Sequence, residues 1–191
     1  MSTSVILCGV GGQGTVLASK LIASAAMERG LPVKTAETIG MSQRGGSVFS
    51  HLRLGEGVAC PLMGTGSADL IIAFEPAEAV RQLPFLREGG SVVVSNAPVV
   101  PVSAMTSGPR YDIDAVLGYL RSSVENLVEI DAAAAARDLG SAKCLNVVLL
   151  GAAVRTGMLG LSEDDVRAAV ERLVPPRFLE LNLRALTYTA G

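Results

Sequence analysis

Six residues near the start of the chain, Gly9-Val-Gly-Gly-Gln-Gly14, carry glycines at the spacing G-x-G-x-x-G. An apolar run precedes them and helical spacing from Thr15 to Arg29 follows, so they stand between a strand and a helix. Such a turn leaves backbone N–H groups open to an anion, with the positive end of the helix behind them. The alternative is that the glycines only let strand, turn and helix pack closely. The candidate ligand contacts are Gly9, Gly11, Gly12, Gln13, Gly14 and Thr15.

A second candidate segment is Glu37-Thr-Ile-Gly-Met-Ser-Gln-Arg-Gly-Gly46, which suits neither a helix nor a sheet. Arg44 offers a planar fork suited to phosphate or carboxylate, and the glycine pair after it leaves room for a ligand or partner backbone. A solvated arginine in a turn is the competing interpretation. Glu75, after an apolar strand and before Pro76, either caps its own neighbourhood or faces a crevice. The candidate contacts in the segment are Ser42, Gln43, Arg44, Gly45 and Gly46.

The composition argues against several classes of function. The chain has 16 basic and 18 acidic residues and only seven aromatic ones (3 Tyr, 4 Phe), which does not favour nucleic-acid binding. No apolar run is long enough to span a bilayer. The three cysteines, Cys8, Cys60 and Cys144, contain no C-x-x-C pair, so we expect them to be buried small side chains and expect no metal or cluster site in this chain. Their spacing and the absence of a leader-like start indicate a cytoplasmic, reduced protein.

A nicotinamide-dependent dehydrogenase is an alternative that the residues disfavour. Such an enzyme needs an acidic residue at the end of the second strand, where Lys34 and Thr35 stand, with Glu37 a little later. The single histidine, His51, falls within a strand pattern, so we expect it to be half-exposed rather than a general acid or base. No catalytic residue is therefore predicted in this chain.

Short apolar segments alternate with helical ones along the whole chain, which predicts a single α/β domain over residues 1–191. We expect three layers: an open mixed or mainly parallel sheet between helices, with a Rossmann-like opening βα turn. Alternation over Ser47–Leu54 and the glycines after it predict a β-hairpin returning through Val58–Cys60. Ligands of such sheets bind beyond the carboxyl ends of the strands, so we expect a site among the loops after Cys8, Ala36, Phe74 and Ser95.

Four segments together resemble the gamma-subunit family of 2-oxoacid:ferredoxin oxidoreductases, and within it most resemble the beta-subunit branch of the indolepyruvate enzymes. SQRGG following G-x-G-G-Q-G is much more specific than the glycines alone, and the match runs in the family's order over roughly residues 3–185. The segments are GVGGQG (Gly9–Gly14), ETIGMSQRGG (Glu37–Gly46), ADLIIAFEPAEA (Ala68–Ala79) and NVVLLGAA (Asn146–Ala153).

The resemblance implies a cytoplasmic complex that oxidatively decarboxylates a 2-oxoacid to an acyl-CoA and carbon dioxide and reduces ferredoxin. It implies that thiamine diphosphate and iron–sulfur clusters lie on larger partner subunits, and that this chain lies on the coenzyme A side of the active site. Neither nucleic acid nor membrane is expected as a partner. The residues alone also leave open a free-standing nucleotide-binding, Rossmann-like oxidoreductase or an interaction module without chemistry.

Overall fold

A computed structural model describes residues 2–37, 46–100 and 111–189 of the chain. Ser42, Gln43, Arg44 and Gly45 lie outside these ranges. No described helix separates β2, β3 and β4, helices lie between the other consecutive strands, and only helices follow β6. In chain order the elements are β1 (Thr3–Val10), α1 (Thr15–Glu28), β2 (Val33–Glu37), β3 (Ser47–Leu54), β4 (Ala68–Ala73), α2 (Pro76–Gln82), η2 (Leu83–Phe85), β5 (Leu86–Ser95), α4 (Ile113–Ser123), β6 (Asn126–Ile130), α5 (Ala132–Leu139), η3 (Ala142–Cys144), α6 (Leu145–Arg155), α7 (Glu163–Leu173) and α8 (Pro176–Leu186).

The described strands form one mixed sheet in the order β2-β3-β1-β4-β5-β6. β1, β4, β5 and β6 are parallel, while β3 runs antiparallel to both β1 and β2. The carboxyl ends of β1 and β4 therefore meet at one edge of the sheet, and β3 begins there because its direction is reversed. The glycine-rich turn, the residue after β4 and the first residue of β3 all come to this edge.

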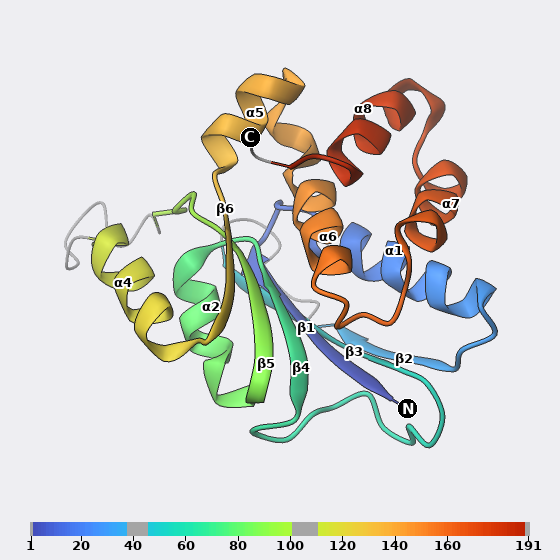
Figure 1. Cartoon of the computed structure of the whole chain (residues 1–191), viewed down its shortest axis with the longest axis horizontal. Coiled ribbons are helices and arrows are strands. Elements are labelled where there is room, and N and C mark those ends of the chain that lie inside the picture. The colour runs from blue at the N-terminus through green and yellow to red at the C-terminus, as the bar shows by residue number, and fades with distance from the viewer. Residues whose placement is uncertain (1, 38–45, 101–110, 190–191) are drawn as a thin grey trace.

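Helices cover both faces of the sheet, which makes the three layers predicted (Figure 1). α2 and α4 lie on one face, and α1 and α6 on the other, with α7 and α8 outside them (Figure 1). Alternating side chains of β1 separate the two cores: Val5 and Leu7 join the core under α1 and α6, and Ile6 and Cys8 join the core under α2. All four are fully buried, so β1 is a rigid base for the turn that follows it.

The antiparallel pairing expected around Ser47–Leu54 is present, but its partner differs from the prediction. β3 pairs with the preceding β2, Leu52 opposite Thr35, and the residues 58–60 form no strand. Because β3 lies between β1 and β2, the strand order also differs from that of nicotinamide-binding Rossmann folds, in which the second strand lies directly beside the first. The resemblance to a Rossmann fold is therefore local to the opening turn.

His51 is buried rather than half-exposed, with 4% of its surface accessible. Its Nδ1 accepts a hydrogen bond from the Met63 N–H at 3.1 Å, and its ring packs between Phe49 and Phe85. The prediction failed because the strand pattern does not show that the chain after β3 folds back over this face. Burial lowers the pKa of His51, so the ring is neutral at neutral pH.

Cys60 is a second correction, because it is exposed, whereas Cys8 and Cys144 are buried as expected. Over residues 2–37, 46–100 and 111–189 no cluster of three or more potential metal-ligating side chains occurs. Within the same residues no helix has the length and apolar character needed to cross a bilayer.

Candidate functional site at the carboxyl edge of the sheet

The glycine-rich turn connects β1 to α1 through two residues with left-handed backbone angles. Gly14, the N-cap of α1, has φ 86° and Gly12 has φ 101°, values that residues other than glycine rarely adopt. A Cβ on Gly14 would lie 2.7 Å from Asn146 Nδ2, whereas one on Gly12 would meet nothing within 4 Å. Asn146 of α6 therefore supports the turn from behind, and Gly12 is its exposed tip.

Gln13 fixes the turn to the sheet. Its Oε1 accepts from the Val10 N–H at 2.7 Å and its Nε2 donates to the Phe74 carbonyl at 2.9 Å. One side chain thus joins the carboxyl ends of β1 and β4, and it lies so close to Gly9 that a Cβ there would be 2.6 Å from Oε1. A single N–H of the amide is left for any ligand, so the first task of Gln13 is to hold the turn.

The first turn of α1 has the features of an anion-binding helix start. Among the described residues no side chain caps it, and its first turn contains no acidic residue. The N–H groups of a helix's first turn have no partners within the helix and carry the positive end of its dipole. Thr15 is buried under this turn and Val16 is 41% exposed, so the open side of the helix start faces solvent.

The structure brings one residue of the second predicted segment to the turn. Gly11 donates its N–H to the Gly46 carbonyl at 2.9 Å. Gly46 and the turn are therefore neighbours, although 35 positions separate them in the sequence. The proposed contacts Ser42 to Gly45 precede this anchored point and belong to the part of the chain that is not described.

A pair of buried carboxylates at the start of α2 lies at the same edge. Glu75 is 1% and Glu78 is 3% exposed, and Ser47 and Tyr111 bind them. Glu75 was predicted either to cap its neighbourhood or to face a crevice; it caps α2, accepting from the Glu78 N–H at 3.0 Å. Sequence reasoning missed Glu78, Ser47, Tyr111 and Asn146. Only the first was accessible, because the E-x-x-E spacing over Glu75 and Glu78 is typical of a helix start.

Cys8 lies near the carboxyl end of β1 and is fully buried, which does not favour a role as a nucleophile. Burial raises the pKa of its thiol well above the ordinary value, and the charges of Glu78 and Glu75 raise it further. The thiol stays protonated, and a protonated thiol is a poor nucleophile.

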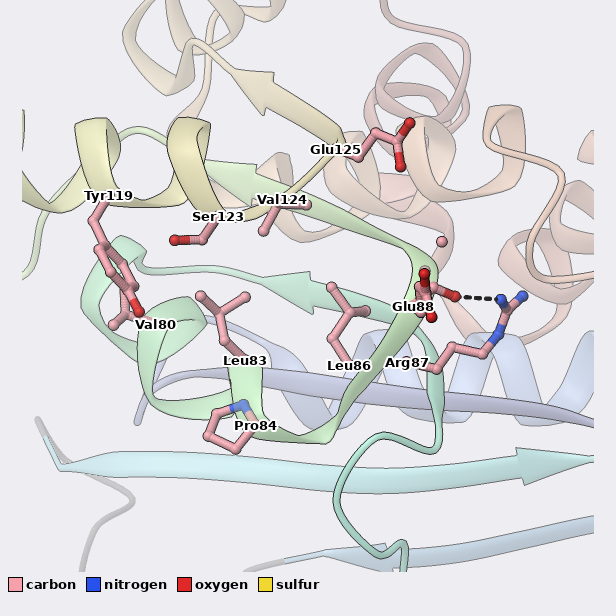
Figure 2. Close-up of a pocket in the computed structure, with 12 residues that line it drawn as sticks. Val80, Leu83, Pro84, Leu86, Arg87, Glu88, Tyr119, Ser123, Val124 and Glu125 are labelled. Atoms are coloured by element: carbon pink, nitrogen blue, oxygen red, sulfur yellow. Dashed lines mark hydrogen bonds between the residues drawn. The ribbon is translucent and has the colours of Figure 1, made fainter.

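Two cavities differ in their relation to the turn. A cleft of about 550 Å³ lies where β5 begins and α4 ends, and Figure 2 shows Tyr119, Val80 and Leu83 around it. Its arginine, Arg87, is already bound to Asp69 at 2.6 Å. Arg87 also donates to the Glu88 carbonyl (Figure 2). A smaller cavity of about 210 Å³ lies beside the turn, lined mostly by apolar side chains, with two asparagines, Ser141 and Lys143 among them. Its lining includes Leu17, Asn146, Val174, Phe178 and Asn182.

The chain folds as a mixed α/β domain that carries a glycine-rich turn at the carboxyl edge of its sheet. The model of the pyruvate ferredoxin/flavodoxin oxidoreductase family matches residues 4–190, and the chain belongs to this family. Over 187 residues it is 37% identical to the indolepyruvate oxidoreductase subunit IorB of Archaeoglobus fulgidus, covering 97% of this chain and 92% of that one.

Two further comparisons show where such a domain occurs. The crystal structure of the gamma subunit of a keto/oxoacid ferredoxin oxidoreductase from Geobacter sulfurreducens matches with TM-score 0.69 and 25% identity, over 96% of this chain and 94% of that one. The ketoisovalerate oxidoreductase subunit VorA of Methanothermobacter thermautotrophicus is 26% identical over 95% of this chain but only 34% of its own length. The chain is a gamma-type subunit of an oxidoreductase complex, and the same module also occurs inside a longer chain.

Proposed function

We propose that this chain is the coenzyme A-side subunit of an indolepyruvate:ferredoxin oxidoreductase. Larger partner subunits carry thiamine diphosphate and the iron–sulfur clusters, decarboxylate the oxoacid and pass electrons to ferredoxin. Membership of the family and 37% identity to an indolepyruvate oxidoreductase subunit support this role. The complex acts in the cytoplasm.

The observation that carries the coenzyme A assignment is the uncapped start of α1. Gln13 and Gly46 fix the glycine-rich turn, and the first turn of α1 after it has neither a side-chain cap nor an acidic residue among the described residues. A phosphate of coenzyme A is a suitable anion for the backbone N–H groups of this first turn. Arg44, two residues before Gly46, supplies the planar charged group that complements a phosphate. The apolar cavity beside Leu17 and Phe178 takes an uncharged part of the same molecule.

The chain's own residues bind and orient in this scheme, and the bond-breaking steps use groups on the partner. Thiamine diphosphate, if bound to the partner, would supply the electron-accepting group that decarboxylation needs. The turn, Thr15 and the Ser42–Gly46 segment hold coenzyme A where its thiol meets the acyl group. The step before coenzyme A enters is therefore independent of this chain's anion site.

Substitution of Arg44 tests the assignment in the complex reconstituted with its partner. Arg44→Ala should raise the KM for coenzyme A by about 10- to 150-fold, the effect of losing a charge-assisted hydrogen bond. The oxoacid-dependent first turnover without coenzyme A should stay within a factor of two or so of the unaltered complex, because it precedes coenzyme A. Arg44→Lys should recover part of the loss, since it keeps the charge but not the fork. An unchanged KM in Arg44→Ala would remove the segment from the coenzyme A site.

The oxoacid is tested separately. Indolepyruvate, phenylpyruvate, ketoisovalerate, pyruvate and 2-oxoglutarate are offered to the same complex, and ferredoxin or dye reduction is measured. The proposal requires the highest kcat/KM with an aryl pyruvate. A higher kcat/KM with pyruvate or 2-oxoglutarate would overturn the substrate part of the proposal and leave the coenzyme A part standing.

A further inference from the structure

Glu75 and Glu78 are buried far more deeply than helix capping requires. Three other α-helices of the described residues have side-chain caps, from Asp112, Asp131 and Ser162, and each of these caps is exposed. Glu75 caps α2 with 1% of its surface accessible. Burying a carboxylate is costly unless several donors compensate it. The burial therefore points to a task beyond starting a helix.

Glu75 collects donors from distant parts of the chain. Its Oε2 accepts from the nearby Glu78 N–H, but its Oε1 accepts from the Tyr111 hydroxyl at 2.5 Å and from the Val99 N–H at 3.4 Å. The Tyr111 oxygen in turn accepts from the Ala77 N–H at 3.1 Å. Val99 and Tyr111 lie on either side of residues 101–110, so Glu75 fixes the chain both before and after them.

Glu78 does the same for the start of β3. Its Oε2 accepts from the Ser47 hydroxyl at 2.6 Å, and its other oxygen pairs with Arg81. Ser47 directly follows Gly46, whose carbonyl accepts from the Gly11 N–H of the glycine-rich turn. A continuous path of bonds thus runs from α2 through Ser47 and Gly46 into the turn.

We propose that Glu75 and Glu78 form a positioning pair that holds Gly46–Ser47, Val99 and Tyr111 in fixed places around the glycine-rich turn, and so sets the geometry of the coenzyme A step. The inference rests on the proposed function for the ligand, and on the contacts of the described residues for the positioning. Glu75, Glu78, Ser47 and Tyr111 are positioning residues, since they act through the backbone they hold.

The Tyr111 hydroxyl keeps its proton, and so can donate to Glu75, at the pH values of ordinary assays. Burial and the hydrogen bond to Glu75 raise the pKa of the Tyr111 hydroxyl above its ordinary value. The hydroxyl stays protonated and remains a donor throughout the range in which the complex is assayed.

Tyr111→Phe in the assembled complex tests the pair, since it removes the hydroxyl and keeps the ring. The expected result is a rise of roughly 10-fold in the KM for coenzyme A, while the oxoacid-dependent first turnover without coenzyme A is unchanged. Ser47→Ala breaks the Glu78 arm separately and should raise the same KM. Tyr119→Phe is the matched control, because Tyr119 is 54% exposed on α4 and lines the distant cleft.

The outcomes separate positioning from mere stability. Tyr111→Phe and Ser47→Ala with unchanged KM for coenzyme A overturn the proposal, whatever they do to the melting temperature. A rise no larger than that of Tyr119→Phe also overturns it. If the Tyr111→Phe complex does not assemble, Ser47→Ala decides, and an unchanged KM there is again a refutation.

Arg44→Ala distinguishes failure of this inference from failure of the proposed function. An effect of Arg44→Ala without one from Tyr111→Phe and Ser47→Ala keeps the coenzyme A site and rejects the positioning pair. If Tyr111→Phe and Ser47→Ala raise the KM for coenzyme A and Arg44→Ala does not, the positioning pair is supported. Arg44 is then not a contact of coenzyme A.

Discussion

Two helices begin at the same edge of the sheet, and their first turns are opposite in character. α1 starts at Gly14 with no side-chain cap and no acid in its first turn. α2 starts at Glu75, which caps it, with Pro76 next and Glu78 within the first turn. Both starts carry the positive end of a helix dipole, although Pro76 of α2 has no N–H to donate. In α2 the Glu75 carboxylate accepts from the Glu78 N–H and the Tyr111 oxygen accepts from the Ala77 N–H, whereas no described side chain caps α1. The open start is the one at which we propose that an external anion binds.

The largest effect should come from closing the α1 start sterically. Gly14→Ala forces a left-handed residue, costing about 1–2 kcal/mol, and places Cβ against Asn146, so the total loss of unfolding free energy should be roughly 2–5 kcal/mol. Gly12→Ala is the matched control, because it shares the backbone strain but meets open space. Urea denaturation measures both. Equal losses would show that Asn146 does not support the turn.

Removing the Glu75 side chain from the start of α2 should lower the free energy of unfolding by an intermediate amount. Glu75→Ala leaves the Tyr111 hydroxyl and the N–H groups of Val99 and Glu78 without their acceptor, at a cost of about 1–3 kcal/mol in unfolding free energy. Asp112→Ala removes an exposed cap that serves only α4, and should cost about 1 kcal/mol. A larger loss in Asp112→Ala would contradict the view that α2 is the internally satisfied start.

The smallest expected effect comes from adding a carboxylate to the first turn of α1, where α2 already has one. Val16 is 41% exposed in the first turn of α1, so Val16→Asp places a carboxylate at the open start. The isolated chain should gain about 0.3–1 kcal/mol of stability, while the KM for coenzyme A in the complex should rise. Val16→Asn has nearly the same shape without the charge. If Asp and Asn behave alike, the helix start is not the anion site.

Much of the fold followed from local signals in the sequence. The helix from Thr15 and the strand over Ser47–Leu54 were predicted, because helical spacing and strand alternation depend on near neighbours in the sequence. The partner of β3 was not, because alternation shows that a strand exists but not which strand it joins. The predicted half-exposure of His51 was wrong for the same reason, since a segment beyond β3 buries this residue.

The candidate site divides in the same way. The turn was predictable, because glycines at the G-x-G-x-x-G spacing between a strand and a helix indicate positions where the backbone needs positive φ angles. The bond from Gly11 to Gly46 and the burial of Glu75 and Glu78 were not, because they depend on β3 reversing direction beside β1. A long-range hydrogen bond leaves no local pattern in a single sequence.

The bridge that Gln13 makes between Val10 and Phe74 has a consequence for binding kinetics. Because this side chain closes the turn within the chain itself, the donors are in place before any ligand arrives. If an anion binds at the turn as we propose, little ordering entropy is lost there, and no slow rearrangement of the turn has to precede binding. Association at this point should follow diffusion and the local field, and should slow as added salt screens that field.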